Sequence, residues 1–225
     1  MTASAPVILA FDTSGPHVAA CLMQDGDIVH EMSEPMARGQ AERLVPALEE
    51  VLAHTGQSWG DLDAIGVGVG PGNFTGIRIS VSAARGLALG LDIPAVGVST
   101  LEAVALTAPR PVTAAASASR GGAFYQVFTA DGAGPPGLEH AEGDVTGWQI
   151  LAARSDRDSP VMAFDAPSDT STETLTTQPD HSLVAGIARI AATRHTDPAL
   201  PRPAPLYIRP ADAAPSRDLP PVLLD

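Results

Sequence analysis

The sequence predicts a mixed α/β protein. Short apolar runs bounded by turn residues alternate with longer segments in which aliphatic residues recur at helical spacing, the pattern of strands and helices packed in layers. A hairpin signal, Gln24-Asp25-Gly26-Asp27, joins two early strands, so part of the sheet is expected to be antiparallel. The third observation is the segment Ile65–Gly76, in which an alternating apolar run leads through a glycine-rich turn into a helix.

The first part of the chain alternates between predicted strands and helices. The strands are expected at residues 7–13, 17–23, 28–33, 63–69 and 95–98. The helices are expected at residues 39–54, 77–89 and 100–107. Pro46 predicts a late start or a kink in the first helix, Gly90 is expected to close the second, and Ser99 is the expected N-cap of the third.

The second part has a weaker pattern, and we place the domain boundary near residues 108–111. Another hairpin is expected, followed by a short helix, a strand and an amphipathic helix, at residues 112–118, 123–129, 146–154, 161–165 and 182–194. Residues 131–137 and 165–180 are expected to be loops, and a proline-rich tail begins at residue 198. The prediction is an N-terminal domain, residues 1–108, and a smaller, divergent C-terminal domain, residues 109–225.

The composition narrows the functional class. The chain has 225 residues, of which 44% are hydrophobic, enough for one large or two small cores. Its net charge is −13 and it contains no lysine, so it should be repelled by a polyphosphate backbone. If the protein acts on RNA, a partner is expected to hold most of the RNA. The apolar run Val7–Phe11 is too short for a signal peptide or a membrane span, so we expect a cytoplasmic protein.

The glycine-rich turn allows two interpretations. A strand, a backbone-exposing turn and a helix N-terminus can hold an anion. However, no lysine follows the last glycine as in a Walker loop, and Thr75 stands where a dinucleotide fingerprint requires its third glycine. The alternative is a tight turn with close backbone packing, followed by a helix whose small residues admit a close partner.

A second candidate feature, Asp12-Thr13-Ser14, ends the first predicted strand. An aspartate with neighbouring hydroxyls can bind Mg²⁺ through water and donate hydrogen bonds to a phosphate. The alternative is an Asx or Ser turn that caps the strand. The candidate nucleotide-binding set is therefore Asp12, Thr13, Ser14, Gly70, Gly72, Thr75 and Gly76.

No catalytic residue and no metal site is predicted. The six histidines do not pair at helical spacing, and no HExxH motif occurs. Cys21 is the only cysteine and lies within a strand pattern without a cue for activation.

Four segments together resemble the bacterial TsaB family: ILAFDTS, AERLVPALEEVL, DLDAIGVGVGPGNFTGIRISVSAARGLAL and IPAVGVSTLEAVA. The resemblance spans residues 7–105, is most specific at GPGNFTGIRI, and resumes faintly at SRGGAFY and PLYIRPADAAP. It implies a two-domain, reduced actin/hexokinase/acetate-kinase-like (ribonuclease H-like) α/β fold with mixed sheets.

The resemblance also implies a function without catalysis. Members of the family are subunits of the machinery that makes N6-threonylcarbamoyladenosine in tRNA, 3′ of the anticodon. They form a heterodimer with the catalytic paralogue TsaD and associate with the ATPase TsaE, so tRNA would be contacted indirectly. No tightly bound cofactor is implied, and the remaining expectation is weak binding of ATP or ADP at a vestigial or shared site.

The chain departs from the family pattern at two places. The segment Arg38-Gly39-Gln40-Ala41-Glu42 replaces a family pattern that contains histidine, and the metal-binding H-x-x-x-H of the paralogue is missing. Residues 118–125 read ASRGGAFY, without the two carboxylates that the family tends to carry.

The resemblance favours the docking interpretation of the helices. Two helices side by side could meet a matching pair from the paralogue, or from a second copy when the chain is isolated. The predicted interface residues are Leu44, Leu48, Val51, Leu52, Ile77, Ser80, Val81, Ala84 and Leu87. The competing function is a small-molecule kinase or ATPase of the same superfamily, with Asp12 and Gly70–Gly76 around ATP.

Overall fold

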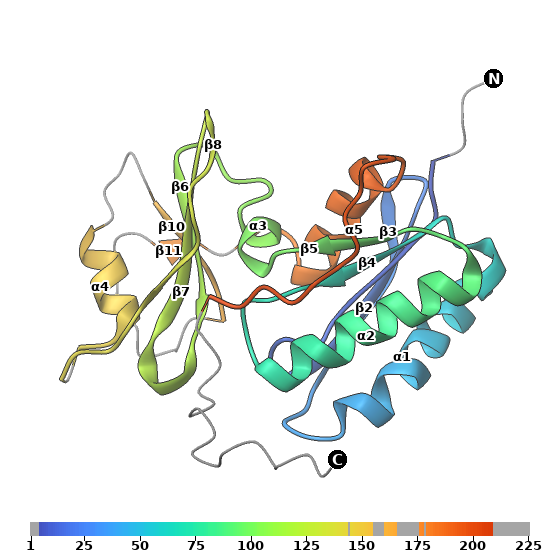
Figure 1. Ribbon diagram of the computed structural model, residues 1–225, viewed down its shortest axis with the longest axis horizontal. Helices are drawn as coiled ribbons and strands as arrows, with labels where there is room; N and C mark the ends of the chain where they lie inside the picture. The colour runs from blue at the N-terminus through green and yellow to red at the C-terminus, as the bar shows by residue number, and fades with distance from the viewer. Residues whose placement is uncertain (1–4, 144, 155–159, 166–175, 178, 209–225) are drawn as a thin grey trace, which may run out of the picture.

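A computed structural model describes residues 5–143, 145–154, 160–165, 176–177 and 179–208 of the chain. Within them the chain forms two mixed sheets that lie next to each other, with helices packed on the faces of the first (Figure 1). This confirms the predicted α/β class with mixed sheets. The predicted tail beyond residue 208, and most of the predicted loop at 165–180, lie outside the described residues.

The first sheet has the strand order β3-β2-β1-β4-β5. Its strands are β1 (Ile8–Asp12), β2 (His17–Gln24), β3 (Asp27–Pro35), β4 (Ala64–Gly68) and β5 (Ala95–Val98). The first three pair antiparallel, and β4 and β5 add in parallel to β1. The hairpin between β2 and β3 turns at Asp25 and Gly26, which both have the positive φ that a two-residue hairpin of this type requires.

The helices α1 (Gln40–Thr55) and α2 (Phe74–Leu91) lie side by side on one face of this sheet (Figure 1). Pro46 does not delay α1, which begins six residues earlier. Helix α2 is longer than predicted at both ends, because Asn73 caps its first turn and Asp92 ends it in the left-handed conformation. Gly90 therefore lies inside α2.

The second sheet has the order β11-β10-β6-β7-β8, and β9 also pairs with β7. Its strands are β6 (Val112–Ser117), β7 (Ala123–Thr129), β8 (Gly132–Ala133), β9 (Gly137–Glu139), β10 (Val161–Phe164) and β11 (Thr176–Thr177), accompanied by α4 (Gly147–Arg154). Short 3₁₀ turns occur at η1 (Trp59–Asp61) and η2 (Ser119–Gly121). The predicted loop 131–137 thus contains short strands, whose partner β7 supplies their hydrogen bonds.

Helix α5 (Leu183–Arg194) follows the second sheet in sequence but packs on the first. It contacts β1, β2 and β4 on the face opposite α1 and α2, and it also contacts α3 (Thr100–Val104), which is shorter than predicted. The first sheet is consequently buried on both faces, with an apolar cluster on each. The division into residues 1–108 and 109–225 stays a prediction. Among the described helices none is long and apolar enough to span a membrane.

Candidate functional site

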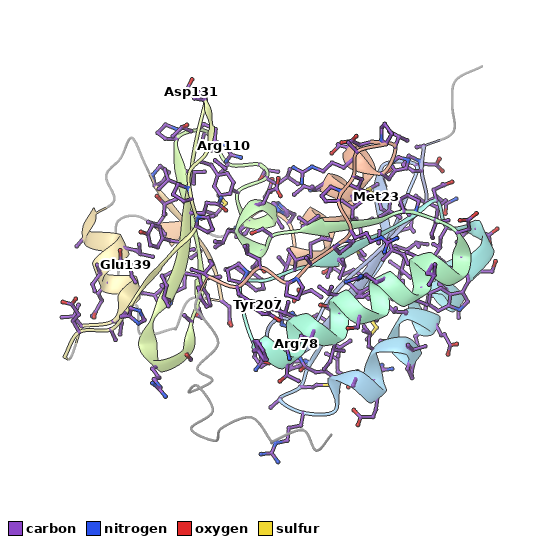
Figure 2. The ribbon with its side chains drawn as sticks, viewed as in Figure 1. Met23, Arg78, Arg110, Asp131, Glu139 and Tyr207 are labelled. Atoms are coloured by element: carbon purple, nitrogen blue, oxygen red, sulfur yellow. The ribbon has the colours of Figure 1, made fainter. Side chains whose placement is uncertain are left out.

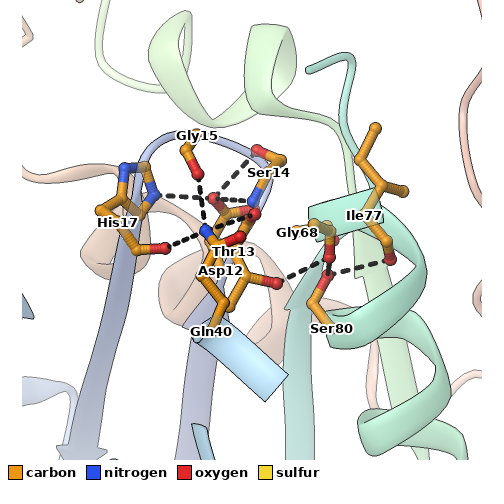
Figure 3. Close-up of polar contacts among 10 residues, drawn as sticks. Asp12, Thr13, Ser14, Gly15, His17, Gln40, Gly68, Ile77 and Ser80 are labelled. Atoms are coloured by element: carbon orange, nitrogen blue, oxygen red, sulfur yellow. Dashed lines mark hydrogen bonds and ion pairs between the residues drawn. The ribbon is translucent and has the colours of Figure 1, made fainter. Parts of the chain in front are cut away.

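The turn after β1 meets the glycine-rich turn before α2 (Figure 3). The Thr13 hydroxyl donates a hydrogen bond to the carbonyl oxygen of Gly76 (2.7 Å), and the Asn73 amide donates to the carbonyl oxygen of Ser14 (2.6 Å). Two of the candidate motifs are therefore brought together, as expected for turns at the ends of neighbouring strands β1 and β4.

The glycines of this contact are required by close packing. A Cβ atom at Gly76 would overlap the carbonyl oxygen of Thr13, and one at Gly72 would overlap that of Ser14. In β4, a Cβ at Gly68 would overlap the carboxylate of Asp12. The glycine pattern thus lets the chain approach its own backbone, which supports the tight-packing interpretation.

The carboxylate of Asp12 is fully buried and organises the turn. Its Oδ2 accepts hydrogen bonds from the amide and the hydroxyl of Ser14 and lies 2.9 Å from Nε2 of His17. Its Oδ1 has no hydrogen-bond partner among the described residues. The side-chain amide of Gln40, in α1, donates to the carbonyl oxygens of Thr13, Gly15 and His17 and fixes the same turn from the other side (Figure 3).

The N-terminus of α2 is capped in part by the chain itself. The side-chain oxygen of Asn73 accepts a hydrogen bond from the backbone amide of Gly76 (2.9 Å), and the backbone amide of Asn73 donates to the carbonyl oxygen of Ser14. An anion that binds to the Gly76 amide at this helix end would have to displace the Asn73 side chain.

A cavity of about 840 Å³ lies beside this turn, between the two sheets. Its walls come from the turns after β1 and β4, from the ends of β6 and β10, and from residues 206–208. Asp165 is the only one of its described lining residues with a charged side chain. Because a triphosphate needs cationic or metal partners, this lining does not complement a nucleotide's phosphates.

An aromatic and cationic cluster lies at the rim of the cavity. Phe74 and Tyr207 stack with ring centroids 5.1 Å apart, and the guanidinium of Arg78 lies 3.8 Å from the centroid of Phe74. Its Nε donates to the hydroxyl of Tyr207 (2.9 Å), and the two side chains lie close together in Figure 2. The Leu206 amide donates to the Val69 carbonyl oxygen, which holds this segment on the first sheet. No local sequence pattern indicated that Gln40, His17 or Tyr207 belongs to the site.

The docking residues predicted from the sequence need correction. Eight of them are buried within this chain, in the cluster between α1, α2 and the first sheet or at the side of α2 that faces it: Leu44, Leu48, Val51, Leu52, Ile77, Ser80, Val81 and Ala84. Leu87 is half-buried. The apolar stripe of each helix is used by the chain's own core, so a partner can reach only the outer faces. Val45, in α1, is 42% exposed and Leu89, in α2, is 84% exposed.

Other polar groups lie apart from this turn. The rings of His30 and His54 stack with centroids 4.5 Å apart, and among the described residues no group of three His, Cys, Asp or Glu side chains is placed to hold a metal. Burial raises the pKa of the Cys21 thiol far above its usual range, so this thiol is not an activated nucleophile.

Comparisons with known proteins agree with this architecture. The family model of TsaD, tRNA N6-adenosine threonylcarbamoyltransferase, matches residues 31–132. No protein of curated function matches the chain by sequence.

Among solved structures, YeaZ from Pseudomonas aeruginosa is 22% identical, with a TM-score of 0.60 over 90% of this chain and 99% of that one. A Pseudomonas aeruginosa protein described as similar to peptidase YeaZ is 24% identical, with a TM-score of 0.64 over 91% of this chain and 100% of that one. The ethanolamine utilization protein EutJ from Carboxydothermus hydrogenoformans is 13% identical, with a TM-score of 0.53 over 82% and 89% of the two chains. The chain thus has the fold of YeaZ, and its segment 31–132 is similar to the TsaD transferase family.

Proposed function

We propose that this protein is a non-catalytic subunit required for threonylcarbamoyl transfer to N6 of a tRNA adenosine, and that it acts by forming a heterodimer with TsaD. In this proposal TsaE associates with the heterodimer and tRNA is held mainly by the partners. The protein works in the cytoplasm, and it self-associates through the same surface when isolated.

The observation that carries the proposal is the position of the TsaD match. Residues 31–132 include both α1 and α2, so the partner is expected to carry counterparts of the same two helices. Two related chains with equivalent helix pairs can meet about a pseudo-twofold axis, in a four-helix contact. A stable contact of this kind buries at least about 1,200 Å² in total.

The outer faces of the helices suit such a contact. The exposed side of α2 carries Ser82 and Gly86, small residues that admit a close approach, and the apolar Leu89. On α1, Val45 adds exposed apolar area. This chain alone leaves Leu89 and Val45 exposed. Burying them against a partner would remove their apolar surface from water.

The absence of a catalytic role is supported by the site geometry. Asp12 is buried and engaged with the chain's own turn, and Asn73 caps the helix at which a phosphate would bind. Any ATP or ADP is therefore proposed to bind weakly, in the cavity or at a site shared with a partner.

The test is co-purification with TsaD from the same organism, using the variant Leu89→Glu. A charge at this position has no partner in the proposed contact, so the variant should lose the complex while remaining folded. Val145→Glu is the matched control, because Val145 is 46% exposed and lies on the second half of the chain, and it should keep the complex. Equal complex formation by both variants would contradict docking through α2.

The second candidate is a small-molecule kinase, because the fold is also shared with an inorganic polyphosphate/ATP-glucomannokinase from Arthrobacter sp., which is 13% identical with a TM-score of 0.50. ATP turnover by the isolated chain would favour this candidate.

A further inference from the structure

A second groove, of about 340 Å³, lies on another part of the molecule, between α5, α3 and the β7–β8 hairpin. It is lined by three arginines, Arg110, Arg189 and Arg194, and by one carboxylate, Glu102. The chain contains only 13 basic residues against 26 acidic ones. The groove therefore carries a net positive charge, whereas the whole chain carries a net negative charge.

The three guanidinium groups are not equally neutralised. Arg194 forms a two-pronged ion pair with Glu102, which raises the pKa of Arg194. Arg110 donates to the carbonyl oxygen of Ala105 (2.7 Å) and lies 5.1 Å from the ring centroid of Phe128, contacts that fix its position without cancelling its charge.

Arg189 is exposed on α5, and within the described part of the chain it forms no hydrogen bond or ion pair. It is one helical turn from Thr193, which also lines the groove. Arg189, from α5, and Arg110, from the loop before β6, thus line the same groove, and neither forms an ion pair with a carboxylate of the described residues. Figure 2 shows Arg110 near the β7–β8 end of the second sheet, away from Arg78 and Tyr207.

We propose that this groove binds phosphate groups, and that these belong to the RNA on which the complex acts. Guanidinium groups bind phosphate oxygens through paired, charge-assisted hydrogen bonds. The positive groove would give an otherwise repelling chain one point of contact with a polyanion. The choice of RNA rests on the proposed function, whereas the phosphate chemistry rests on the arginines alone.

The experiment titrates the full-length chain with inorganic pyrophosphate by calorimetry and with labelled tRNA by fluorescence anisotropy, at two salt concentrations. Arg189→Glu should weaken the binding of both about tenfold or more, and should reduce the slope of log K against log salt for tRNA by about one. Arg120→Glu is the matched control, with the same change in net charge at an exposed position at the opposite end of β6 and β7, and its affinities should stay within about twofold of the wild type.

Each outcome decides a separate point. Binding of pyrophosphate but not of tRNA would support the anion site and overturn its assignment to RNA. No binding of either ligand, or equal weakening by the two variants, would overturn the proposal. Complex formation with TsaD is measured by co-purification, independently of these titrations. Failure of the proposed function would therefore appear in the co-purification and not in the titrations.

Discussion

Asp12 illustrates how a residue that is typical of nucleotide sites can serve the fold instead. Its carboxylate is removed from solvent and receives three hydrogen-bonding groups, from Ser14 and His17. A buried carboxylate is stabilised only when such partners are present. Removing it leaves the Ser14 amide and the His17 ring without their acceptor.

We therefore expect Asp12→Ala to lower the free energy of unfolding by about 3 kcal/mol, because the buried polar groups of Ser14 and His17 lose their shared partner. Asp61→Ala is the control: Asp61 accepts from the Ser58 amide and hydroxyl in an exposed capping box, so its loss should cost clearly less than the loss of the buried Asp12. Urea denaturation of both variants measures the difference. Equal costs would mean that Asp12 does not organise the turn.

At the scale of elements, helix α2 shows how one glycine can be indispensable and another replaceable. Gly76, in the first turn, faces the carbonyl oxygen of Thr13, whereas no heavy atom lies within 4 Å of the position that a Cβ would take at Gly86. Both positions lie in the same helix, so replacing glycine by alanine should bring a similar gain in helix propensity at each of them.

The matched pair Gly76→Ala and Gly86→Ala should change stability in opposite directions. Gly76→Ala should destabilise the chain by about 3 kcal/mol, because backbone must move to admit the methyl group. Gly86→Ala should stabilise it by about 0.5 to 1 kcal/mol through helix propensity. Thermal denaturation followed by circular dichroism measures both. A neutral Gly76→Ala would contradict the close contact between the two turns.

The start of α5 is tied to α3 through a titratable contact. Asp180 accepts from His181 (2.8 Å) and from the Thr107 hydroxyl (2.7 Å), and these hydrogen bonds, His181 first, lower the pKa of Asp180 below its usual value. His181 also binds the carbonyl oxygen of Ala103 in α3. The contact thus links the segment that leads into α5 to α3 and the residues just after it.

Because the pKa of Asp180 is lower in the folded chain than in the unfolded chain, its contribution to stability is present above the unfolded pKa and is lost as pH falls through the folded value. The difference in unfolding free energy between wild type and Asp180→Asn should therefore be full well above the ordinary pKa of an aspartate, about 3.9, and should be lost as pH falls through the lower pKa of the folded chain. Denaturation at a series of pH values tests this. A difference that is constant with pH would contradict the role of the charged form.

At the scale of the molecule, local patterns predicted the strands and helices well because the signals were local. The Asp25–Gly26 turn marked the hairpin, and the helical spacing marked α1, α2 and α5. The strands β8 and β9 were missed because they depend on pairing with β7 rather than on their own residues.

The candidate site was predicted in part for the same reason. Asp12–Ser14 and Gly70–Gly76 were recognisable as turns after strands, and β1 and β4 are neighbours. The contribution of Tyr207, which is far from Phe74 in sequence, is a tertiary contact without a local signal. An apolar stripe likewise does not reveal whether it faces the chain's own sheet or a partner. For Leu48 and Ala84 it faces the chain's own core.

We propose that this chain is required by a transferase and performs no chemistry itself. The most direct measurement is threonylcarbamoyl transfer to tRNA by TsaD from the same organism, together with TsaE and the threonylcarbamoyl donor, in the presence and absence of this chain. Transfer is expected only when the chain is present, with full transfer for Val145→Glu and loss for Leu89→Glu. Transfer at the same rate without the chain would contradict it.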